Sequence, residues 1–151
     1  MSILYKQNGL NLDGTKCEIT IASGPVIVND EGKILLHRSP DTGKYQFTGG
    51  RLDDDFSPRA NAKYRPAQDL GAEIELVAGV EPLIIQGEVG KGKRVVLIHY
   101  LARLSDRENP LRGEYKWCTL KEVRAMHAKG EMSSPNVLLA TEFFLNSIRE
   151  R

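Results

Sequence analysis

The feature that most constrains the fold is a loop and helix bounded by glycines in the first half of the chain. A glycine pair ends at Gly50, and Ser57 and Pro58 follow a polar loop. Serine suits the position just before a helix, and proline suits the first helical position. Gly71 can end the helix, because glycine adopts the left-handed conformation found there without strain. The pattern predicts a helix over residues 58–70.

Pro66 lies inside this predicted helix. Proline lacks the amide hydrogen that would bond to the carbonyl of Ala62, and its ring crowds the same turn, which costs roughly 3 kcal/mol in a regular helix. We therefore expect a kink or an early break near residues 62–66.

The apolar segments before the helix have the composition of β-strands. Residues 17–29 are rich in isoleucine and valine and contain a Ser-Gly-Pro corner. We interpret them as two strands broken by that corner. The sequence Asn-Asp-Glu-Gly at 29–32 is typical of a tight turn and leads into a short apolar strand over 33–39. A β-hairpin is expected before the glycine pair.

Strand and helix patterns follow one another in the second half of the chain. Residues 73–89 and 93–104 predict two strands joined by a Gly-Lys-Gly-Lys turn. The continuous apolar run of the second is typical of a strand buried on both faces. Residues 114–120 predict a short strand, and helical patterns cover 120–130 and 134–151.

The composition is that of an ordinary α/β globular protein. The 151 residues are 40% hydrophobic and 27% charged, so we expect one domain over 1–151. The net charge of +1 indicates neither nucleic acid nor a membrane as a partner. No segment approaches the roughly 20 apolar residues that span a bilayer, so a cytoplasmic protein is expected. Cys17 and Cys118 lack metal or disulfide spacing and are interpreted as reduced, buried thiols.

The order of hairpin, glycine turn, helix, strands and final helix resembles Nudix hydrolases over residues 17–151. Their signature motif is G-x5-E-x7-R-E-U-x-E-E-x-G-U, where U is aliphatic. Laid on Gly50, it places its second glycine on Gly71. The approach Lys-Tyr-Gln-Phe-Thr-Gly-Gly is similar to the family's W-x-x-P-G-G, and Glu114 and Trp117 match its E-x-x-W element. The resemblance implies a Nudix-type α/β/α sandwich around a mixed β-sheet.

Most acidic positions of this motif hold other residues here. The positions of the first glutamate, the Arg-Glu pair, the aliphatic residue and the Glu-Glu pair hold Phe56, Tyr64, Arg65, Pro66, Gln68 and Asp69. Nudix enzymes cleave a diphosphate linked to another group, using Mg²⁺ or Mn²⁺ held by these carboxylates. Only Asp69 remains a carboxylate, and Arg65 repels a cation. We therefore do not expect a conventional multi-metal site, and we expect weakened or lost hydrolysis.

A reduced catalytic and metal site remains open. Asp55 lies one residue before the first missing glutamate, and with Asp69 it supplies two carboxylates for Mg²⁺ or Mn²⁺ if the loop bends suitably. The alternative is that both are solvated acids. Glu73, Glu88 and Glu114 are further substitutes, since some members of the superfamily use carboxylates outside the motif.

Cationic and polar residues near the glycine turn are candidates for ligand binding. A guanidinium at Arg65, in the metal's place, can pair directly with a phosphate or carboxylate. The predicted ligand-binding set is Gly50, Arg51, Lys44, Arg38, Arg65, Gln68 and Glu114. The alternative for each charged member is a solvated or structural side chain. His37, His99 and His127 show no ligand spacing and are interpreted as structural.

Three functions remain open at this point. The first is a binding module for a nucleoside-diphosphate derivative or another small phosphorylated or anionic ligand. The second is an active Mg-dependent pyrophosphohydrolase with a non-canonical carboxylate set. The third is a structural or protein-interaction role, and a homodimer is compatible with the sequence. We favour binding, because the scaffold is kept while the glutamates are replaced.

Overall fold

The computed structural model describes residues 8–10, 16–52 and 56–149 of the chain. Twelve elements follow one another along it. In chain order they are β1 (Asn8–Leu10), β2 (Lys16–Ile27), β3 (Ile34–Arg38), β4 (Tyr45–Gln46), β5 (Gly50–Arg51), α1 (Pro58–Leu70), β6 (Ile74–Leu76), β7 (Leu83–Gly90), β8 (Lys93–Leu104), β9 (Tyr115–Cys118), α2 (Leu120–Ala128) and α3 (Asn136–Arg149). The short strand and the two helices predicted after residue 114 are thereby confirmed.

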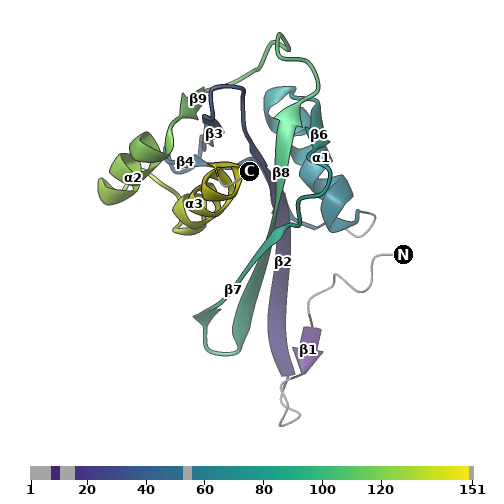
Figure 1. Cartoon of the computed structure of the whole chain (residues 1–151). Coiled ribbons are helices and arrows are strands. Elements are labelled where there is room, and N and C mark those ends of the chain that lie inside the picture. Colours follow the sequence, from purple (N-terminus) through teal and green to yellow (C-terminus); the bar gives the residue numbers. More distant parts are fainter. Residues whose placement is uncertain (1–7, 11–15, 53–55, 150–151) are drawn as a thin grey trace.

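The strands form two sheets with helices on both sides. A six-stranded mixed sheet has the order β1-β2-β8-β6, with β5 also paired to β2 and β7 to β8. A three-stranded sheet has the order β4-β3-β9. Helix α1 lies on one side of the long β2–β8 pair, and α2 and α3 lie on the other (Figure 1). The predicted α/β/α arrangement around a mixed sheet is confirmed.

Strand β2 is continuous, so the prediction of two strands broken at the Ser-Gly-Pro corner is wrong. Strand β8 runs parallel to it along residues 18–27. Pro25 pairs with Tyr100 in this ladder, and no described strand pairs with β2 on the other side at that position. A proline at such an open edge removes no ladder hydrogen bond, so the strand continues through the corner.

The predicted tight turn after β2 is present, but it leads into the second sheet. The side-chain oxygen of Asn29 accepts hydrogen bonds from the backbone N–H groups of Glu31, at 3.0 Å, and Lys33, at 2.9 Å. A bridge between Val28 and Ile34 joins the two arms of the turn. Beyond it, β3 pairs with β4 and β9 instead of following β2. The expected hairpin is therefore short.

Helix α1 has the predicted boundaries. Ser57 accepts a hydrogen bond from the backbone nitrogen of Ala60 at 3.1 Å, and Gly71 ends the helix with a φ of 67°. The early break predicted near Pro66 is wrong, because the helix continues through this residue. Pro66 and Ala62 are both buried, and the helix packs mainly against β2. Tertiary packing thus offsets the lost helical hydrogen bond.

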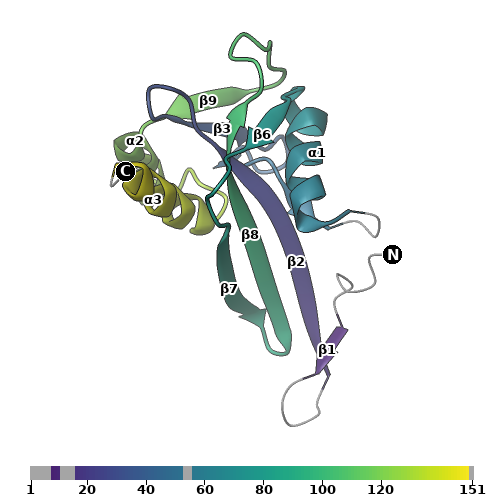
Figure 2. The same cartoon turned by 45° about the vertical axis from the view of Figure 1, so that its right-hand side comes forward.

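Residues 73–89 do not form the single strand that was predicted. They form β6 and β7, which both pair antiparallel with β8 and are separated by residues 77–82. This connection contains Gly79, with a φ of 76°, and Pro82, both of which interrupt strands. Strand β8 is central as predicted, but residues 93–98 are exposed or half-buried and extend past the helices (Figure 2). The prediction that β8 is buried on both faces is therefore wrong for residues 93–98.

Two apolar clusters lie on opposite sides of the central strands. The larger contains Val26, Leu36 and Phe144 and brings β2 and β3 together with α2 and α3. The smaller contains Ile27 and Leu70 and lies under α1. Successive side chains of a strand point to opposite faces, so the neighbours Val26 and Ile27 enter different clusters.

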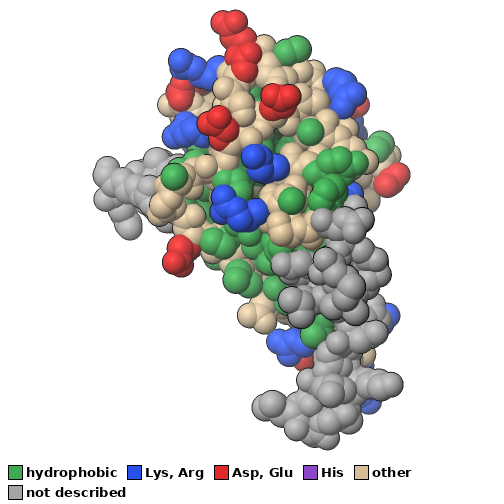
Figure 3. Space-filling model, turned by 90° about the vertical axis from the view of Figure 1, so that its right-hand side faces the viewer, with side chains coloured by type: hydrophobic (Ala, Val, Ile, Leu, Met, Phe, Trp, Pro, Cys, Tyr) green, Lys and Arg blue, Asp and Glu red, His purple; other side chains and the backbone are tan. Residues whose placement is uncertain are grey.

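Neither sign of charge dominates the face that carries α1 (Figure 3). On the side that carries α1, Lys and Arg side chains alternate with Asp and Glu side chains (Figure 3). Among the described residues, no helix is long and apolar enough to cross a membrane. Ligand selectivity in this chain therefore depends on local sites.

The side chain of Asn61 joins α1 to two strands. Asn61 is fully buried, and its Nδ2 donates hydrogen bonds to the Oγ of Ser23 and to the carbonyl oxygen of Gly50, both at 3.0 Å. Its Oδ1 accepts a hydrogen bond from the Nε of Arg65 at 3.2 Å. The Ser23 hydroxyl in turn donates to the carbonyl of Pro58 at 2.8 Å. One amide thus satisfies polar atoms of β2, β5 and α1.

Replacing Asn61 by leucine keeps the volume but leaves the polar atoms of Ser23 and Gly50 without this partner. Each unpaired buried group costs about 1–3 kcal/mol, so we expect the free energy of unfolding to fall by about 3 kcal/mol in urea denaturation. Lys63→Leu, at an exposed position of the same helix, is the matched control and should change it by less than about 0.5 kcal/mol. Equal losses in the two variants would contradict a special role for Asn61.

The glycine turn touches β2 through its backbone. A Cβ at Gly24 would lie 2.3 Å from the carbonyl oxygen of Thr48 and 3.1 Å from the Cα of Gly49. A Cβ at Gly49 would lie 2.7 Å from the carbonyl oxygen of Ser23. Only glycine permits two backbones to approach this closely. The contact holds the glycine turn against β2, the strand with helices on both of its sides.

Gly24→Ala should destabilise the protein, because the added methyl group meets a backbone oxygen that cannot move aside. Overpacking of this kind costs about 2–3 kcal/mol, so we expect the midpoint of thermal unfolding to fall by on the order of 5–10 °C in circular dichroism. Gly87→Ala on β7 is the control, since a Cβ there meets no atom within 4 Å. A Gly24→Ala protein as stable as this control would show that the contact is not tight.

Candidate functional site

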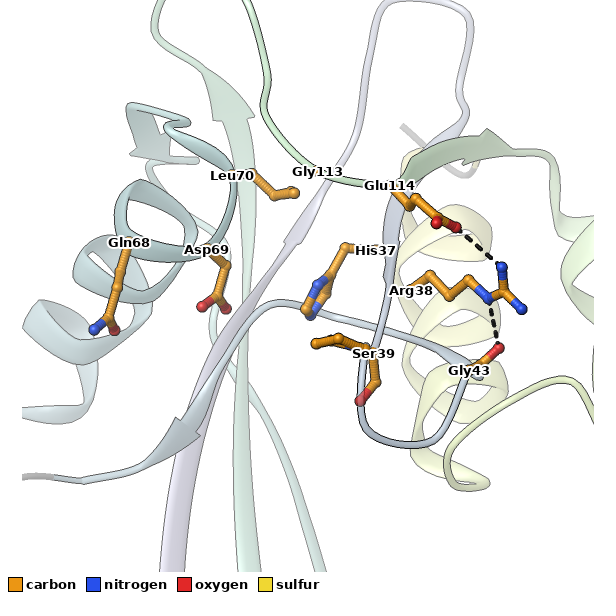
Figure 4. Close-up of a pocket in the computed structure, with 10 residues that line it drawn as sticks. His37, Arg38, Ser39, Gly43, Gln68, Asp69, Leu70, Gly113 and Glu114 are labelled. Carbon is orange, nitrogen blue, oxygen red and sulfur yellow. Dashed lines mark hydrogen bonds and ion pairs between the residues drawn. The ribbon is translucent and has the colours of Figure 1, made fainter.

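A cavity of about 680 Å³ opens between the C-terminal turn of α1 and the end of β3. Gln68 and Asp69 line it from the helix, and His37 and Arg38 line it from the strand. The loop after β3 and the residues before β9, including Glu114, complete the wall. In Figure 4 the Asp69 carboxylate faces His37, while Arg38 lies on the Glu114 side. We call this hollow the charged cavity.

The fold brings four predicted site residues together in the charged cavity: Arg38, Gln68, Asp69 and Glu114. Arg38 donates a hydrogen bond from Nη1 to the carboxylate of Glu114 at 3.1 Å, and its Nε donates to the carbonyl oxygen of Gly43 at 2.9 Å. Both members of this ion pair are largely exposed, so a ligand anion can compete for the guanidinium. The cavity therefore offers one cation with two carboxylates.

His37 belongs to this cavity, although its sequence context indicated a structural role. Burial lowers its pKa, and the nearby charge of Asp69 and a hydrogen bond with the backbone of Phe47 offset part of that effect. Its Nε2 lies 3.3 Å from the Nε2 of Gln46, its neighbour in the β3–β4 ladder. The imidazole is therefore predominantly neutral at pH 7 and adds no cation to the cavity.

A second hollow of about 210 Å³ lies beside the glycine turn, and none of the described residues that line it is an aspartate, glutamate, lysine or arginine. Its walls come from β2, the turn, β8 and the N-terminal end of α3. Two lining atoms, the Oγ1 of Thr48 and the Nδ1 of His99, are buried without a hydrogen-bond partner. Buried polar atoms in proteins are rarely unpaired, so both indicate room for a polar ligand group or a water. We call this hollow the uncharged cavity.

His99 is the most buried histidine of the described residues. Only 5% of it is exposed, its ring packs edge-on against Phe47, and its Nε2 lies 3.0 Å from the amide nitrogen of Asn136. Burial lowers its pKa from 6.5 to about 4, and the backbone of Gly24 offsets part of that effect without forming a hydrogen bond of ordinary geometry. His99 is therefore neutral over the physiological range.

Arg65 lies over the glycine turn, in the position where the resemblance expects a metal-binding glutamate. Its Nη2 donates a hydrogen bond to the carbonyl oxygen of Arg51 at 2.8 Å, and its Nε donates to Asn61. A Cβ at Gly50 would lie 3.2 Å from the Arg65 guanidinium carbon. The guanidinium thus holds the backbone of β5, and Arg65 lines neither cavity. Gly50 itself lines the uncharged cavity.

The other predicted site residues to be placed are Lys44, Asp55, Glu73 and Glu88. Lys44 is exposed and lines neither cavity. Asp55 lies outside the described residues. Glu73 borders a separate hollow at the start of β6, and Glu88 lies 3.8 Å from Arg94 on the β7–β8 arm. Of the substitute carboxylates in the described residues, only Glu114 lines the same cavity as Asp69.

The described residues of the charged cavity do not by themselves supply a donor set for a resident divalent metal. Mg²⁺ and Mn²⁺ require several oxygen ligands, and in the Nudix motif these come mainly from glutamates. In the part of the chain that the structure describes, no group of three or more His, Cys, Asp or Glu side chains could hold a metal ion. At the motif positions of the cavity, Asp69 contributes a carboxylate and Gln68 a neutral amide. The Asp55–Asp69 pair remains a prediction.

Comparison with solved structures identifies the fold. A NUDIX hydrolase from Nitrosomonas europaea has a TM-score of 0.71 at 18% sequence identity, over 86% of this chain and 90% of that chain. The E. coli ORF135 protein has a TM-score of 0.65 at 24% identity, over 89% and 94%. The Ap4A hydrolase of C. elegans has a TM-score of 0.64 at 19% identity, over 84% and 98%. The chain is therefore a Nudix-fold protein.

The sequence itself carries a weaker signal than the fold. No family model matches it, and no curated protein matches it either. At identities as low as those of the solved structures, the likeness establishes the architecture, while activity has to be argued from the site.

Sequence reasoning missed the polar side chains of the uncharged cavity, as well as His37 of the charged one. His99 and His37 were interpreted as structural because they lack mutual ligand spacing, and Gln46 and Asn136 carried no motif. These residues meet only because the β3–β4 ladder and the start of α3 converge on the glycine turn. The signal that the sequence offered for this cavity was the position of Gln46, three residues before the glycine pair.

The stability of the protein should depend on pH through His99. The folded pKa of about 4 lies below the ordinary value of 6.5, so between these values the unfolded chain takes up a proton that the folded chain does not. The free energy of unfolding is therefore highest above pH 6.5 and falls as the pH decreases towards 4, by roughly 3 kcal/mol from this group. The lowered pKa of His37 adds a loss in the same direction.

Urea denaturation across this pH range checks the effect. His99→Gln should flatten the pH dependence of the free energy of unfolding, because the titrating group is removed. His127→Gln, on the exposed surface of α2, should leave the dependence unchanged. A His99→Gln protein with the wild-type slope would show that His99 is not held neutral by burial.

Proposed function

We propose that this Nudix-fold protein binds a nucleoside-diphosphate derivative, or a similar small ligand with an anionic and an uncharged part, and that hydrolysis is weakened or lost. The observation that carries the proposal is the adjacency of two unlike cavities. His37 lines the charged cavity, and Gln46, which contacts it, lines the uncharged one. A ligand that places its anionic group near Arg38 and an uncharged polar group beside His99 matches this arrangement.

The loss of hydrolysis is supported by the atoms at the motif positions. Nudix chemistry needs several carboxylates around a cation, since the metal neutralises the phosphate and helps to activate water. Arg65 instead places a guanidinium at one of these positions and uses it to hold the carbonyl of Arg51. Gln68 is an amide, so Asp69 is left without the carboxylate neighbour of the motif.

Active hydrolysis is the second candidate function, and one observation favours it. Asp69 and Glu114 line the same cavity, so two carboxylates face a ligand bound there. Nitrosomonas europaea and C. elegans proteins of the same fold are described as hydrolases, the latter of Ap4A. In this reading Mg²⁺ or Mn²⁺ would be supplied by the medium together with the substrate.

Calorimetry and product analysis with the same ligands separate the two functions. The ligands are ADP-ribose, Ap4A and nucleoside triphosphates, each with and without Mg²⁺ or Mn²⁺. We expect binding of at least one of them, with no turnover. Arg38→Gln should weaken that binding about 10-fold to 100-fold, because charge-assisted hydrogen bonds contribute about 1.5–3 kcal/mol. Arg124→Gln, which removes an ion pair with Glu142, is the control.

Asp69→Asn distinguishes the readings further. In a binding protein this change removes a negative charge beside the anion and should leave affinity equal or higher. In a hydrolase it should abolish product formation. Sustained turnover that Asp69→Asn eliminates would overturn the binding proposal, and a failure of all three ligand classes to bind would overturn both functions.

A further inference from the structure

Two hydrogen-bonded chains of the same kind end at the uncharged cavity. In the first, the hydroxyl of Ser133 donates to the Oε1 of Gln46 at 2.9 Å, and the Nε2 of Gln46 lies 3.3 Å from the Nε2 of His37. In the second, the hydroxyl of Ser134 donates to the Oδ1 of Asn136. The Nδ2 of Asn136 lies 3.0 Å from the Nε2 of His99.

The direction of each chain follows from the placement of its amide. The amide oxygen lies on the serine hydroxyl, which donates to it, so the amide nitrogen faces the imidazole with its hydrogens. A nitrogen that carries only donors requires an acceptor opposite it, and the acceptor is the Nε2 of His37 or His99. In a neutral imidazole one nitrogen accepts and the other carries the proton. Both rings are therefore held with the proton on Nδ1.

The surroundings of the two rings are consistent with this assignment. Burial lowers the pKa of both His37 and His99, so both rings are neutral at pH 7. The backbone of Phe47 raises the pKa of His37, as a carbonyl oxygen near the ring does. His99 has no hydrogen-bond partner at Nδ1, so its only hydrogen-bonded nitrogen is the one that faces Asn136.

We propose that His37 and His99 are positioning residues that fix the amides of Gln46 and Asn136, so that the uncharged cavity presents amide N–H donors to its ligand. Each amide nitrogen carries two hydrogens and uses one on the histidine, which leaves the other for the cavity that both amides line. The unpaired hydroxyl of Thr48 adds a group that donates or accepts.

This arrangement selects a chemical class of ligand. Two fixed N–H donors recognise carbonyl oxygens or unprotonated ring nitrogens. The lining that the structure describes contains no charged side chain, which disfavours a charged group. The class is an uncharged group with hydrogen-bond acceptors, which the heterocycle of the proposed nucleoside-diphosphate ligand supplies. The inference rests on the proposed function, since it assigns this cavity to the uncharged part of that ligand.

The tautomers of the histidines test the positioning role without any ligand. Nitrogen NMR of protein with ¹⁵N-labelled histidine is recorded at about pH 8, above the ordinary histidine pKa. In the wild type, His37 and His99 should both show a protonated Nδ1 and an unprotonated Nε2. His127, exposed on α2, is the internal reference.

Carboxylate variants then reverse the direction of each chain separately. Gln46→Glu replaces the donating nitrogen by an acceptor, so His37 must place a proton on Nε2, while His99 stays unchanged. Asn136→Asp should have the same effect on His99 and leave His37 unchanged. Each variant thus controls for the other, and Gln86→Glu on β7 should change neither ring. A merely structural contact would not produce this exchange of protons.

Two results would overturn the inference: a protonated Nε2 on either ring in the wild type, or spectra that do not respond to the matching variant. Calorimetry with ADP-ribose and with ribose 5-phosphate, which lacks the heterocycle, completes the test. Asn136→Ala, which removes one donor without adding a charge, should weaken ADP-ribose at least 10-fold and leave ribose 5-phosphate unchanged, and equal weakening of both would contradict the assigned ligand class. If neither these compounds nor Ap4A or a nucleoside triphosphate binds the wild type, the proposed function fails, while the NMR result still decides the positioning role.

Discussion

The buried amide of Asn61 is the interaction on which the arrangement of both cavities depends. It bonds β2 through Ser23 and β5 through the Gly50 carbonyl, and it orients Arg65 across the turn. Because these bonds join α1 to the sheet at one point, they also set where the C-terminal turn of the helix places Asp69. A buried polar network of this kind specifies one geometry, since every alternative leaves some of its members unpaired.

The same network explains how the chain can replace motif glutamates and keep the fold. In Nudix hydrolases the glutamates serve the metal, so their removal affects the reaction before it affects the packing. Here the helix is held by its caps, its apolar face and the Asn61 bonds, none of which needs a carboxylate. Arg65 also contributes to the scaffold by holding the carbonyl of Arg51. The helix of the motif has thus kept its architectural role.

The two cavities differ because they draw on different parts of the fold. The charged cavity is formed by ends of elements and loops, where Arg38, Asp69 and Glu114 stay in contact with water. The uncharged cavity lies against β2 and β8, close to the large apolar cluster, so charged side chains there would carry a high desolvation cost. The neutral ring of His99 and the amides of Gln46 and Asn136 supply its polarity at a lower cost. A ligand with an anionic part and an uncharged part suits these two cavities.

Local sequence signals sufficed for elements that have characteristic residues at their ends, such as the helix from Pro58 to Leu70 and the turn after β2. They also gave the order of elements that resembles Nudix hydrolases. They failed where tertiary contacts override local preference. β2 passes through Pro25 because an open edge tolerates it, and α1 continues through Pro66 because packing offsets the lost bond. The predicted site was recovered in part, since Arg38, Gln68, Asp69 and Glu114 share a cavity. Only the tertiary structure decided that Arg65 faces the backbone and that His37 and His99 each meet an amide, because these contacts join residues whose spacing in the sequence carries no periodic signal.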